Sequence, residues 1–383
     1  MYRAPVSEIA FALKLAAGMQ SNSGESAAGA TALGDLSEDL VDQILEEAGR
    51  FATEEIAPLN AVGDKHPAQL NDAAVTMPPG WKQVYHRWCE AGWNGLTGPE
   101  AYGGQDLPTM LSVATQEMWN AASMAYGVGP TLTIGAIEAL NAHASDELKA
   151  VYLPKMISGE WTGTMNLTEP QAGSDLGALK TRAEPVGDGR YRIFGQKIFI
   201  TYGEHDMTDN IVHLVLARLP DAPPGTKGIS LFVVPKFLVD EDGSLGARND
   251  VFCNGVEHKL GIHGSPTCTM IYGDGFAGNE PGAIGWLVGE KNRGLACMFT
   301  MMNNARLAVG IQGVGIAERA LQQAVAYAGD RRQGRAPGWS GEGMSPIIEH
   351  PDILQMLLAM RGLTAASRAI CFSCAHAIDM AEA

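Results

Sequence analysis

The spacing of apolar residues changes twice along this chain, near residue 161 and again near residue 291. From about 35 to 158 the apolar residues recur at helical spacing, and beyond 291 they do so again. Between these regions they form short β-branched or aromatic runs, separated by turns such as Gly187-Asp188-Gly189. Because no helix-length segment separates these runs, a parallel sheet with crossover helices is disfavoured, and an antiparallel barrel or sandwich fits better.

The chain is therefore expected to have a multi-domain α+β fold. We place an N-terminal helical domain at residues 1–160, an antiparallel β-barrel-like middle domain at 161–290, and the first part of a C-terminal helical bundle at 291–383. A length of 383 residues is sufficient for these domains and for a sizeable core. In the middle domain, 211–219 and 228–236 are almost continuously apolar, which predicts two buried strands.

Two N-terminal helices are predicted with defined buried faces. The first is amphipathic, with three apolar residues at helical spacing: Ile9, Leu13 and Ala16. The second places four apolar residues on one face: Leu40, Ile44, Ala48 and Phe51. The small-residue segment 21–34 between them predicts a linker, and Ser145 is a suitable N-cap for a later helix.

Two long helices are predicted after residue 291. In the first, an apolar stripe over roughly nine turns contains Leu295, Met298, Met302, Ala305, Val309, Ile316, Ala320, Ala324 and Tyr327. The second should begin near Pro351, because proline suits the first position of a helix.

Charge and cysteine content limit the partners and the compartment. The net charge of −16 argues against nucleic acid and against an anionic membrane surface, which usually bind a basic face. No apolar run is long enough to span a membrane. The six cysteines are too few for a disulfide scaffold, so a reducing compartment such as the cytoplasm fits best. Cys371 and Cys374 form a CxxC pair, interpreted as a helix-face pair rather than a redox or metal site.

The segment Thr168–Asp175, with the sequence TEPQAGSD, is the first candidate site. It follows a strand-like stretch, Trp161–Leu167, and could be no more than a solvent-exposed turn. Alternatively, Gly173 lets the backbone approach a ligand closely, while Thr168 and Ser174 offer hydroxyl and backbone N–H groups. Such a loop suits the edge of a flavin or a pyrophosphate.

The segment QKIFITYG, residues 196–203, is the second candidate. It has the composition of a strand whose alternation is broken where Thr201 stands beside two aromatic residues, Phe199 and Tyr202. An edge strand with a mixed face would explain this pattern without any ligand. The functional interpretation has Thr201 donating a hydrogen bond to a ring nitrogen while Phe199 packs against the ring.

Cationic residues on and after the first long C-terminal helix are candidates for anion binding. Arg306 either lies along the surface or anchors a phosphate or carboxylate, which arginine binds through two donors. Arg331, Arg332 and Arg335 cluster at the end of the same helix, where cations complement the helix dipole. His350 could be no more than a helix cap.

Taken in order, these segments resemble the acyl-CoA dehydrogenase family. The matching order is a helical region, then MNLTEPQAGSDLG, then KIFITYG about thirty residues later, then NNARLAVGIQGVGIAERALQQAVAYAGDRRQGR. The similarity extends over nearly the whole chain from about residue 40. The opening MYRAPVSEIAF and the stretch PIIEHPDILQMLL are similar to the larger bacterial branch, which includes the 3-methylthiopropanoyl-CoA dehydrogenases.

The resemblance implies a helical N-terminal domain, a small β domain and a C-terminal four-helix bundle that together bind FAD. The family chemistry removes an α-proton from an acyl-CoA substrate and transfers the β-hydride to flavin N5, which gives a trans-2-enoyl-CoA. The electrons then pass to an electron-transfer flavoprotein. The family also implies fatty acid metabolism and a homodimer or homotetramer.

The resemblance also implies which residues bind FAD. These are Leu167, Thr168, Gly173, Ser174, Phe199, Ile200, Thr201, Arg331, Gln333 and His350. Leu167 and Thr168 should meet the pyrimidine edge of the flavin, and Ser174 should lie by the pyrophosphate and the substrate's pantetheine. Phe199 and Thr201 match the positions that pack on the ring and hydrogen-bond near N5, although the family usually has tryptophan in place of Phe199.

Two further groups follow from the same resemblance. Arg331 and Gln333 match positions that reach the FAD of a neighbouring subunit, and His350 matches one that touches FAD. Asn303 and Arg306 match the CoA-binding helix, where the family often has aspartate in place of Asn303.

The resemblance assigns no catalytic base. In most members the glutamate that acts as the catalytic base lies on a loop far beyond the Arg306 position, past the last residue of this chain. In a minority it immediately precedes that arginine, where this chain has Ala305. We therefore expect the chain to be the first two-thirds of a longer enzyme, with a half-built bundle and exposed apolar helix faces.

Two other functions fit the same residues. An acyl-CoA oxidase uses the same scaffold and returns the electrons to oxygen, so rapid peroxide formation by the reduced enzyme would identify it. A non-catalytic acyl-CoA or flavin-binding fragment is consistent with Ala305 and with the unassigned base. The acyl chain length is not readable, because residues that line an acyl pocket have the same composition as core residues.

Overall fold

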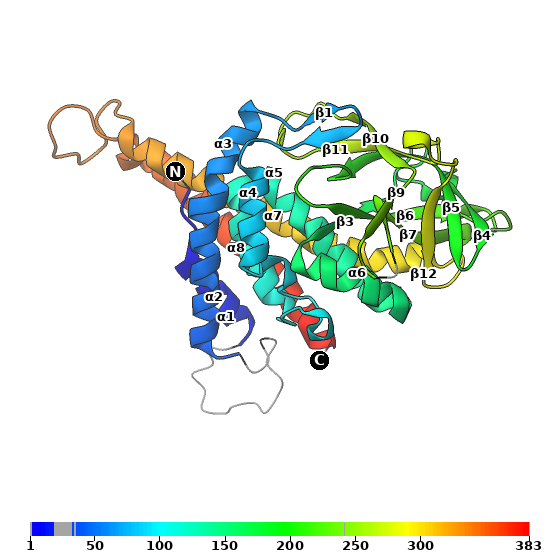
Figure 1. The fold of residues 1–383 in the computed structure, drawn as a ribbon. Helices are drawn as coiled ribbons and strands as arrows, with labels where there is room; N and C mark the ends of the chain where they lie inside the picture. The colour runs from blue at the N-terminus through cyan, green and yellow to red at the C-terminus, as the bar shows by residue number, and fades with distance from the viewer. Residues whose placement is uncertain (1, 19–32, 34–35, 241, 383) are drawn as a thin grey trace. The chain divides into compact units, whose positions relative to one another are not determined.

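The computed structural model describes residues 2–18, 33, 36–240 and 242–382 (Figure 1). The chain forms two compact units. The first, here called the helical unit, comprises Met1–Pro58, Pro108–Met124 and Leu307–Ala383. The second, here called the sheet unit, comprises Leu59–Leu107 and Ala125–Arg306. This mixture of helix and sheet confirms the predicted α+β fold, while the domain boundaries at 160/161 and 290/291 stay predictions.

The main α-helices of the helical unit lie at its two ends and in one central segment of the sequence. They are α1 (Val6–Ala16), α2 (Glu38–Phe51), α8 (Pro351–Glu382) and parts of α5 (Thr109–His143) and α7 (Gly294–Asp330). The predicted first helix is confirmed, because Ile9 and Leu13 are fully buried. The start of α8 at Pro351 is also confirmed. Of the linker predicted at 21–34, only Leu33 is among the described residues.

The predicted buried face of α2 is wrong in the first turns of the helix. Leu40 is 42% exposed, whereas Val41 and Leu45 are fully buried. Apolar residues stand in adjacent pairs in this helix, so the helical period alone allows two phases. The structure adopts the phase that runs through Val41 and Leu45 to Ala48.

The apolar stripe predicted along α7 is buried near the start of the helix and exposed farther on. Met298 is fully buried, but Val309 is 60% exposed and Tyr327 is 63% exposed. The later turns bury a different set: Ala308, Ile311, Val314, Leu321 and Ala328. Met298 and Val309 lie on nearly the same face of a straight α-helix, so the change follows the division of α7 between the units: residues up to Arg306 belong to the sheet unit and those from Leu307 to the helical unit, and the two parts bury different faces. The exposed residues agree with the expectation of uncovered apolar helix faces.

The sheet unit is built around an eight-stranded sheet. Its strands are β3 (Trp161–Asn166), β4 (Arg182–Gly187), β5 (Arg190–Thr201), β6 (Asn210–Arg218), β7 (Ile229–Pro235), β10 (Val251–Val256), β11 (Thr267–Tyr272) and β12 (Ala283–Val288). The strand order is β10-β11-β5-β12-β7-β6-β3, and β4 pairs with both β5 and β6. Strands β5, β12, β7, β6 and β4 thus form a closed ring, which confirms the barrel-like prediction. The pairs are antiparallel except β3–β6 and β4–β6.

Two small hairpins accompany this sheet. They are β1 (Gln69–Asn71) with β2 (Ala74–Thr76), and β8 (Phe237–Val239) with β9 (Leu245–Arg248). The β1–β2 hairpin interrupts the region whose periodicity was interpreted as helical throughout. Its turn residues, Asp72 and Ala73, have positive φ angles of 45° and 68°, and this left-handed backbone ends the helical pattern.

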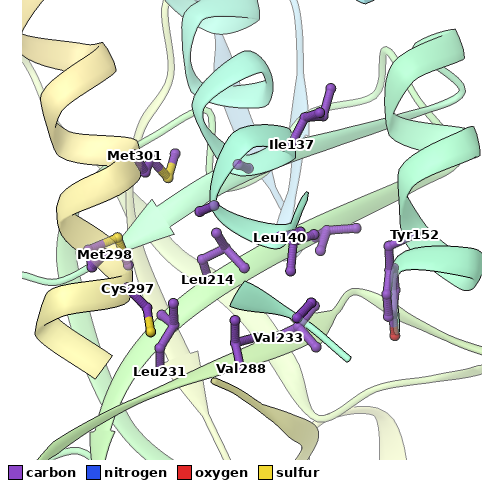
Figure 2. Packing of buried hydrophobic residues seen from close by; sticks show 14 of the residues in the cluster. Ile137, Leu140, Tyr152, Leu214, Leu231, Val233, Val288, Cys297, Met298 and Met301 are labelled. Atoms are coloured by element: carbon purple, nitrogen blue, oxygen red, sulfur yellow. The ribbon is translucent and has the colours of Figure 1, made fainter. Parts of the chain in front are cut away.

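Helices pack on the sheet and close its core. The sheet unit adds α3 (Ala57–Lys65), α4 (Trp81–Glu90) and α6 (Asp146–Ser158) to its parts of α5 and α7. Ser145 caps α6 as predicted, because its side chain accepts a hydrogen bond from the Leu148 N–H at 3.4 Å. Figure 2 shows the resulting core, in which Leu140 of α5 and Met298 of α7 lie with Leu231 of β7.

Two observations concern the compartment and the cysteines. In the part of the chain that the structure describes, no helix is both long and apolar enough to cross a bilayer. The six cysteines are all free. Cys371 and Cys374 both lie on α8, the first buried and the second exposed, in agreement with a helix-face pair.

Candidate functional site

The loop that follows β3 is a structured turn. The Glu169 N–H donates to the Ala172 carbonyl at 2.9 Å, and the Ala172 N–H donates back to the Glu169 carbonyl at 3.0 Å. The Asp175 carboxylate accepts a hydrogen bond from the Gly177 N–H at 2.9 Å and so caps the next helical turn. The Glu169 backbone and the Asp175 side chain therefore shape the turn.

A buried ion pair supports this loop from below. Lys197 Nζ in β5 lies 2.8 Å from Glu169 Oε1, and the two side chains are exposed by only 0% and 3%. The Glu169 carboxylate also accepts hydrogen bonds from the Thr181 N–H at 3.0 Å and from Thr181 Oγ1 at 2.6 Å. Lys197 donates in addition to the Leu167 carbonyl oxygen at 2.9 Å. The pair thus joins the loop to the neighbouring strand.

The electrostatics of the pair follow from its burial. Burial opposes ionisation of Glu169, but Lys197 and the hydrogen bonds around the carboxylate outweigh it and lower the Glu169 pKa to about 2. Burial lowers the pKa of Lys197 to about 8, although the Glu169 carboxylate acts in the opposite direction. At neutral pH both groups are charged, and the ion pair is intact.

The loop and β5 lie side by side. The Ile198 N–H donates to the Thr168 carbonyl at 2.9 Å, and Thr164 Oγ1 in β3 donates to the Thr201 carbonyl at 2.7 Å. The two candidate segments, thirty residues apart in the sequence, therefore form one surface. Thr168 and Thr201 are partly exposed on it, and Gly173 and Ser174 are exposed.

Phe199 has an unusual backbone and an exposed ring. Its φ angle is +60°, and its side chain is 57% exposed although it belongs to a strand. The β5–β11 register shifts beside it, between the pairs Cys268–Ile200 and Met270–Lys197. This bulge turns the ring out of the sheet. Residues 195–201 of β5 pair with β11, whereas β4 and β12 pair with residues 190–194, so the alternative of an edge strand stays a prediction for this segment.

Tyr202 anchors the end of β5. Its hydroxyl donates to the Ala125 carbonyl at 2.7 Å and accepts from Trp81 Nε1 at 3.3 Å. Tyr202 has a φ angle of +51° and is therefore, after Phe199, the second residue with a left-handed backbone in this short segment. Ile200 is only 3% exposed, so its side chain points into the core and not toward a ligand.

Sequence reasoning gave no role to Lys197, Glu169, Thr164 or Tyr202. Lys197 stands directly before the apolar run 198–200, and this was the available signal, because a buried ammonium needs a partner. The identity of that partner depends on the tertiary fold. Among the described residues, no three His, Cys, Asp or Glu side chains form a group that could hold a metal ion.

Asn303 and Arg306 form a separate exposed pair on α7. Arg306 Nη1 donates to Asn303 Oδ1 at 3.2 Å, and the guanidinium lies 5.3 Å from the centre of the Phe299 ring. The cation–π contact and the hydrogen bond hold the guanidinium over the helix surface. Both residues belong to the sheet unit.

Arg331, Gln333 and His350 come together in the helical unit. Arg331 Nη2 donates to Gln333 Oε1 at 3.3 Å, and His350 Nε2 lies 2.9 Å from the Gln333 carbonyl oxygen. The Ile347 N–H donates to the Arg331 carbonyl at 2.8 Å, which ties the segment before α8 to the end of α7. The predicted site residues thus form three groups: one on the loop and β5, one on α7, and this one.

Comparison with known proteins gives the same order of domains. The chain matches the acyl-CoA dehydrogenase N-terminal domain over residues 39–160, the middle domain over 164–274 and the C-terminal domain over 292–383. It is 51% identical over 338 residues to a 3-methylmercaptopropionyl-CoA dehydrogenase from Ruegeria pomeroyi, a match that covers 88% of this chain and 56% of the relative. This similarity confirms the resemblance to the larger bacterial branch.

Two more proteins extend the comparison. A mitochondrial isovaleryl-CoA dehydrogenase from Oryza sativa subsp. japonica is 32% identical over 352 residues, which cover 90% of this chain and 75% of the relative. The structure of an acyl-CoA dehydrogenase from Bacillus anthracis complexed with FAD has a TM-score of 0.70 and 25% identity, with 89% of this chain and 51% of that chain covered.

The chain spans just over half the length of the Ruegeria pomeroyi relative, at 56%. Within that span the three matched domains follow one another in the family order. The loop and strand motifs lie side by side in the region of the middle domain. This chain belongs to the acyl-CoA dehydrogenase family.

Proposed function

We propose that the protein is an FAD-dependent acyl-CoA dehydrogenase, which converts an acyl-CoA thioester to a trans-2-enoyl-CoA and passes the electrons to an electron-transfer flavoprotein. One observation carries the proposal: the Leu167–Ser174 loop and the Phe199–Thr201 segment form one surface, joined by the bond from Ile198 N–H to the Thr168 carbonyl at 2.9 Å. An exposed aromatic ring, two threonine hydroxyls and free loop backbone lie together on that surface.

The residues on this surface suit a flavin. The Phe199 ring, 57% exposed, offers a flat apolar face for a second ring system. A Cβ added at Gly173 would meet only the Thr168 methyl, at 3.8 Å, so a ligand can approach the loop backbone closely. The motif residues themselves carry no net positive charge, so pyrophosphate binding here would depend on neutral N–H and hydroxyl donors.

Each residue has a distinct proposed role. Leu167 and Thr168 would hold the pyrimidine edge, and Gly173 and Ser174 would contact the pyrophosphate, with Ser174 also near the substrate's pantetheine. Phe199 would pack on the ring, with Ile200 contributing backbone only. Thr201 would donate a hydrogen bond near N5. When bound, FAD supplies the acceptor for the substrate's β-hydride.

The other two groups would act on different parts of the ligands. Asn303 and Arg306 would bind the CoA moiety, with Arg306 contributing the charge. Arg331 and Gln333 would reach the FAD of a neighbouring subunit, which requires a homodimer or homotetramer, and His350 would touch FAD. No residue is proposed as the catalytic base, because Ala305 stands at the alternative position of that glutamate.

The remaining proposals concern the substrate, the cellular location, the metabolic role and the domain boundaries. The 51% identical relative favours 3-methylmercaptopropionyl-CoA as the first thioester to assay. We also propose a cytoplasmic location, a role in fatty acid metabolism, and domain boundaries at 160/161 and 290/291.

Two measurements test this function. Thr168→Val combined with Ser174→Ala should lower the flavin content after gel filtration, and unchanged flavin content would contradict the role of the loop. The FAD-loaded protein, reduced chemically with dithionite, should reoxidise slowly in air and quickly with an electron-transfer flavoprotein. Rapid peroxide formation would instead identify an oxidase.

A further inference from the structure

Lys197 contacts the one peptide unit that the flavin proposal depends on most. Its ammonium donates to the Leu167 carbonyl oxygen at 2.9 Å, and this carbonyl belongs to the Leu167–Thr168 peptide. In a trans peptide the C=O and N–H groups point in opposite directions. The Thr168 N–H therefore points away from Lys197.

The following peptide is fixed by the same strand. The Thr168 carbonyl accepts from the Ile198 N–H at 2.9 Å. Two adjacent residues of β5, Lys197 and Ile198, thus hold the carbonyls of the two peptides on either side of the Thr168 Cα. Within the described part of the chain, no acceptor takes the Thr168 N–H. This donor is left for a ligand, and its direction is set by contacts on the opposite side of the loop.

Lys197 can also change the strength of this donor. A cation at a peptide oxygen draws electron density from the amide and makes its N–H a stronger donor, because hydrogen bonds in a chain polarise one another. The side chain is fully buried, and its one ionic partner is Glu169 at 2.8 Å. Burial keeps water away from the ammonium, so its field on the Leu167 carbonyl is screened less than in solution, while the Glu169 carboxylate offsets part of it.

We propose that Lys197, held by Glu169, is a positioning residue that orients and polarises the Thr168 N–H toward the pyrimidine edge of the flavin. This inference rests on the proposed flavin role of the loop. Lys197 does not touch the cofactor: it acts through the Leu167–Thr168 peptide. Its loss should weaken FAD binding and lower the flavin reduction potential, because reduction adds negative charge that an N–H donor stabilises.

A variant must separate this role from simple stability. Lys197→Met alone leaves Glu169 charged and buried without its cation, and the chain could fail to fold. The double variant Lys197→Met/Glu169→Gln removes both charges together and retains a side chain that accepts from Thr181. The matched control is Lys236→Met/Glu204→Gln, which removes both charges of another ion pair of the sheet unit, at side-chain exposures of 16% and 2%.

The experiment titrates each purified, FAD-depleted chain with FAD, follows the quenching of flavin fluorescence, and measures the midpoint potential of the bound flavin. The double variant should bind FAD about tenfold or more weakly, the effect of one lost charge-assisted bond, and with a more negative potential. The control variant Lys236→Met/Glu204→Gln should match the wild type in both Kd and midpoint potential.

The outcomes distinguish the two proposals. If the wild-type chain binds no FAD, the proposed function itself is wrong. If the wild type binds and the double variant has the same Kd and potential, the role of Lys197 is wrong while the function stands. An equal loss in the control variant Lys236→Met/Glu204→Gln would also overturn the inference, because it would reveal a general effect of destabilisation.

Discussion

Arg368 in α8 donates hydrogen bonds to both carboxylate oxygens of Glu117 in α5, at 2.6 and 2.9 Å, and the two side chains are exposed by only 2% and 1%. Arg368 also donates to Glu318 in α7 at 3.1 Å, so one guanidinium joins segments of three helices. Burial raises the Glu117 pKa even though Arg368 acts to lower it. The packing of the helical unit thus depends on one buried cation.

Replacing Arg368 with methionine should destabilise the protein strongly. The change leaves Glu117 and Glu318 buried without a cation, which costs about 3–5 kcal/mol of the free energy of unfolding. Urea denaturation at pH 7 measures the loss. The control is Arg361→Met, which removes a pair between Glu8 and an arginine that is 63% exposed, and should cost less than about 1 kcal/mol. Equal losses in the two variants would contradict the buried network.

The Glu169 carboxylate should make the protein sensitive to acid. Its folded-state pKa is about 2, against an ordinary value of 4.5. Its contribution to stability is therefore complete above pH 4.5 and is lost as the pH falls toward 2. The amount is on the order of 3 kcal/mol.

Urea titrations at several pH values check this prediction. Wild type should be much more stable than Glu169→Gln at pH 7, and the difference should shrink as the pH falls from 4.5 to 2. A difference between the two that stays constant across this range would show that Glu169 does not titrate with a lowered pKa.

The sequence was a good guide wherever local pattern decides structure. The change from helical to strand spacing located the sheet, and the spacing of the loop motif and the 196–203 strand identified two segments that the fold joins. The start of α8 at Pro351 followed from one residue with a fixed φ.

Other features depend on contacts between distant residues. The partner of Lys197 is 28 residues away in the sequence, and that of Arg368 is 251 residues away. The spacing of apolar residues therefore could not predict either ion pair. In α2 the choice between Leu40 and Val41 for the core required the neighbouring helices. The positive φ of Phe199 comes from a bulge opposite β11, and no local composition signals it.

Arg306→Ala should weaken acyl-CoA binding more than FAD binding. The guanidinium is exposed on α7, where one hydrogen bond to Asn303 and the contact with Phe299 hold it, so its removal should leave the fold intact. Loss of one charge-assisted contact with an anionic CoA group corresponds to roughly tenfold or more in Kd. Isothermal titration with CoA and with FAD makes the comparison. Equal losses for the two ligands would mean that Arg306 has only a structural role.

Phe199→Gly should separate stability from flavin binding. The residue has a φ of +60°, which glycine adopts without strain and other residues adopt at a cost of about 1 kcal/mol. Its ring is 57% exposed, so little buried apolar contact is lost with it. The free energy of unfolding should therefore change by less than about 1 kcal/mol, while FAD binding weakens because the flavin loses its packing surface. Phe199→Ala, which removes the ring and retains the strained backbone, should lose the same FAD affinity and be the less stable of the two. If Phe199→Gly unfolds at much lower urea yet binds FAD normally, the ring is a structural element and its place in the flavin site is wrong.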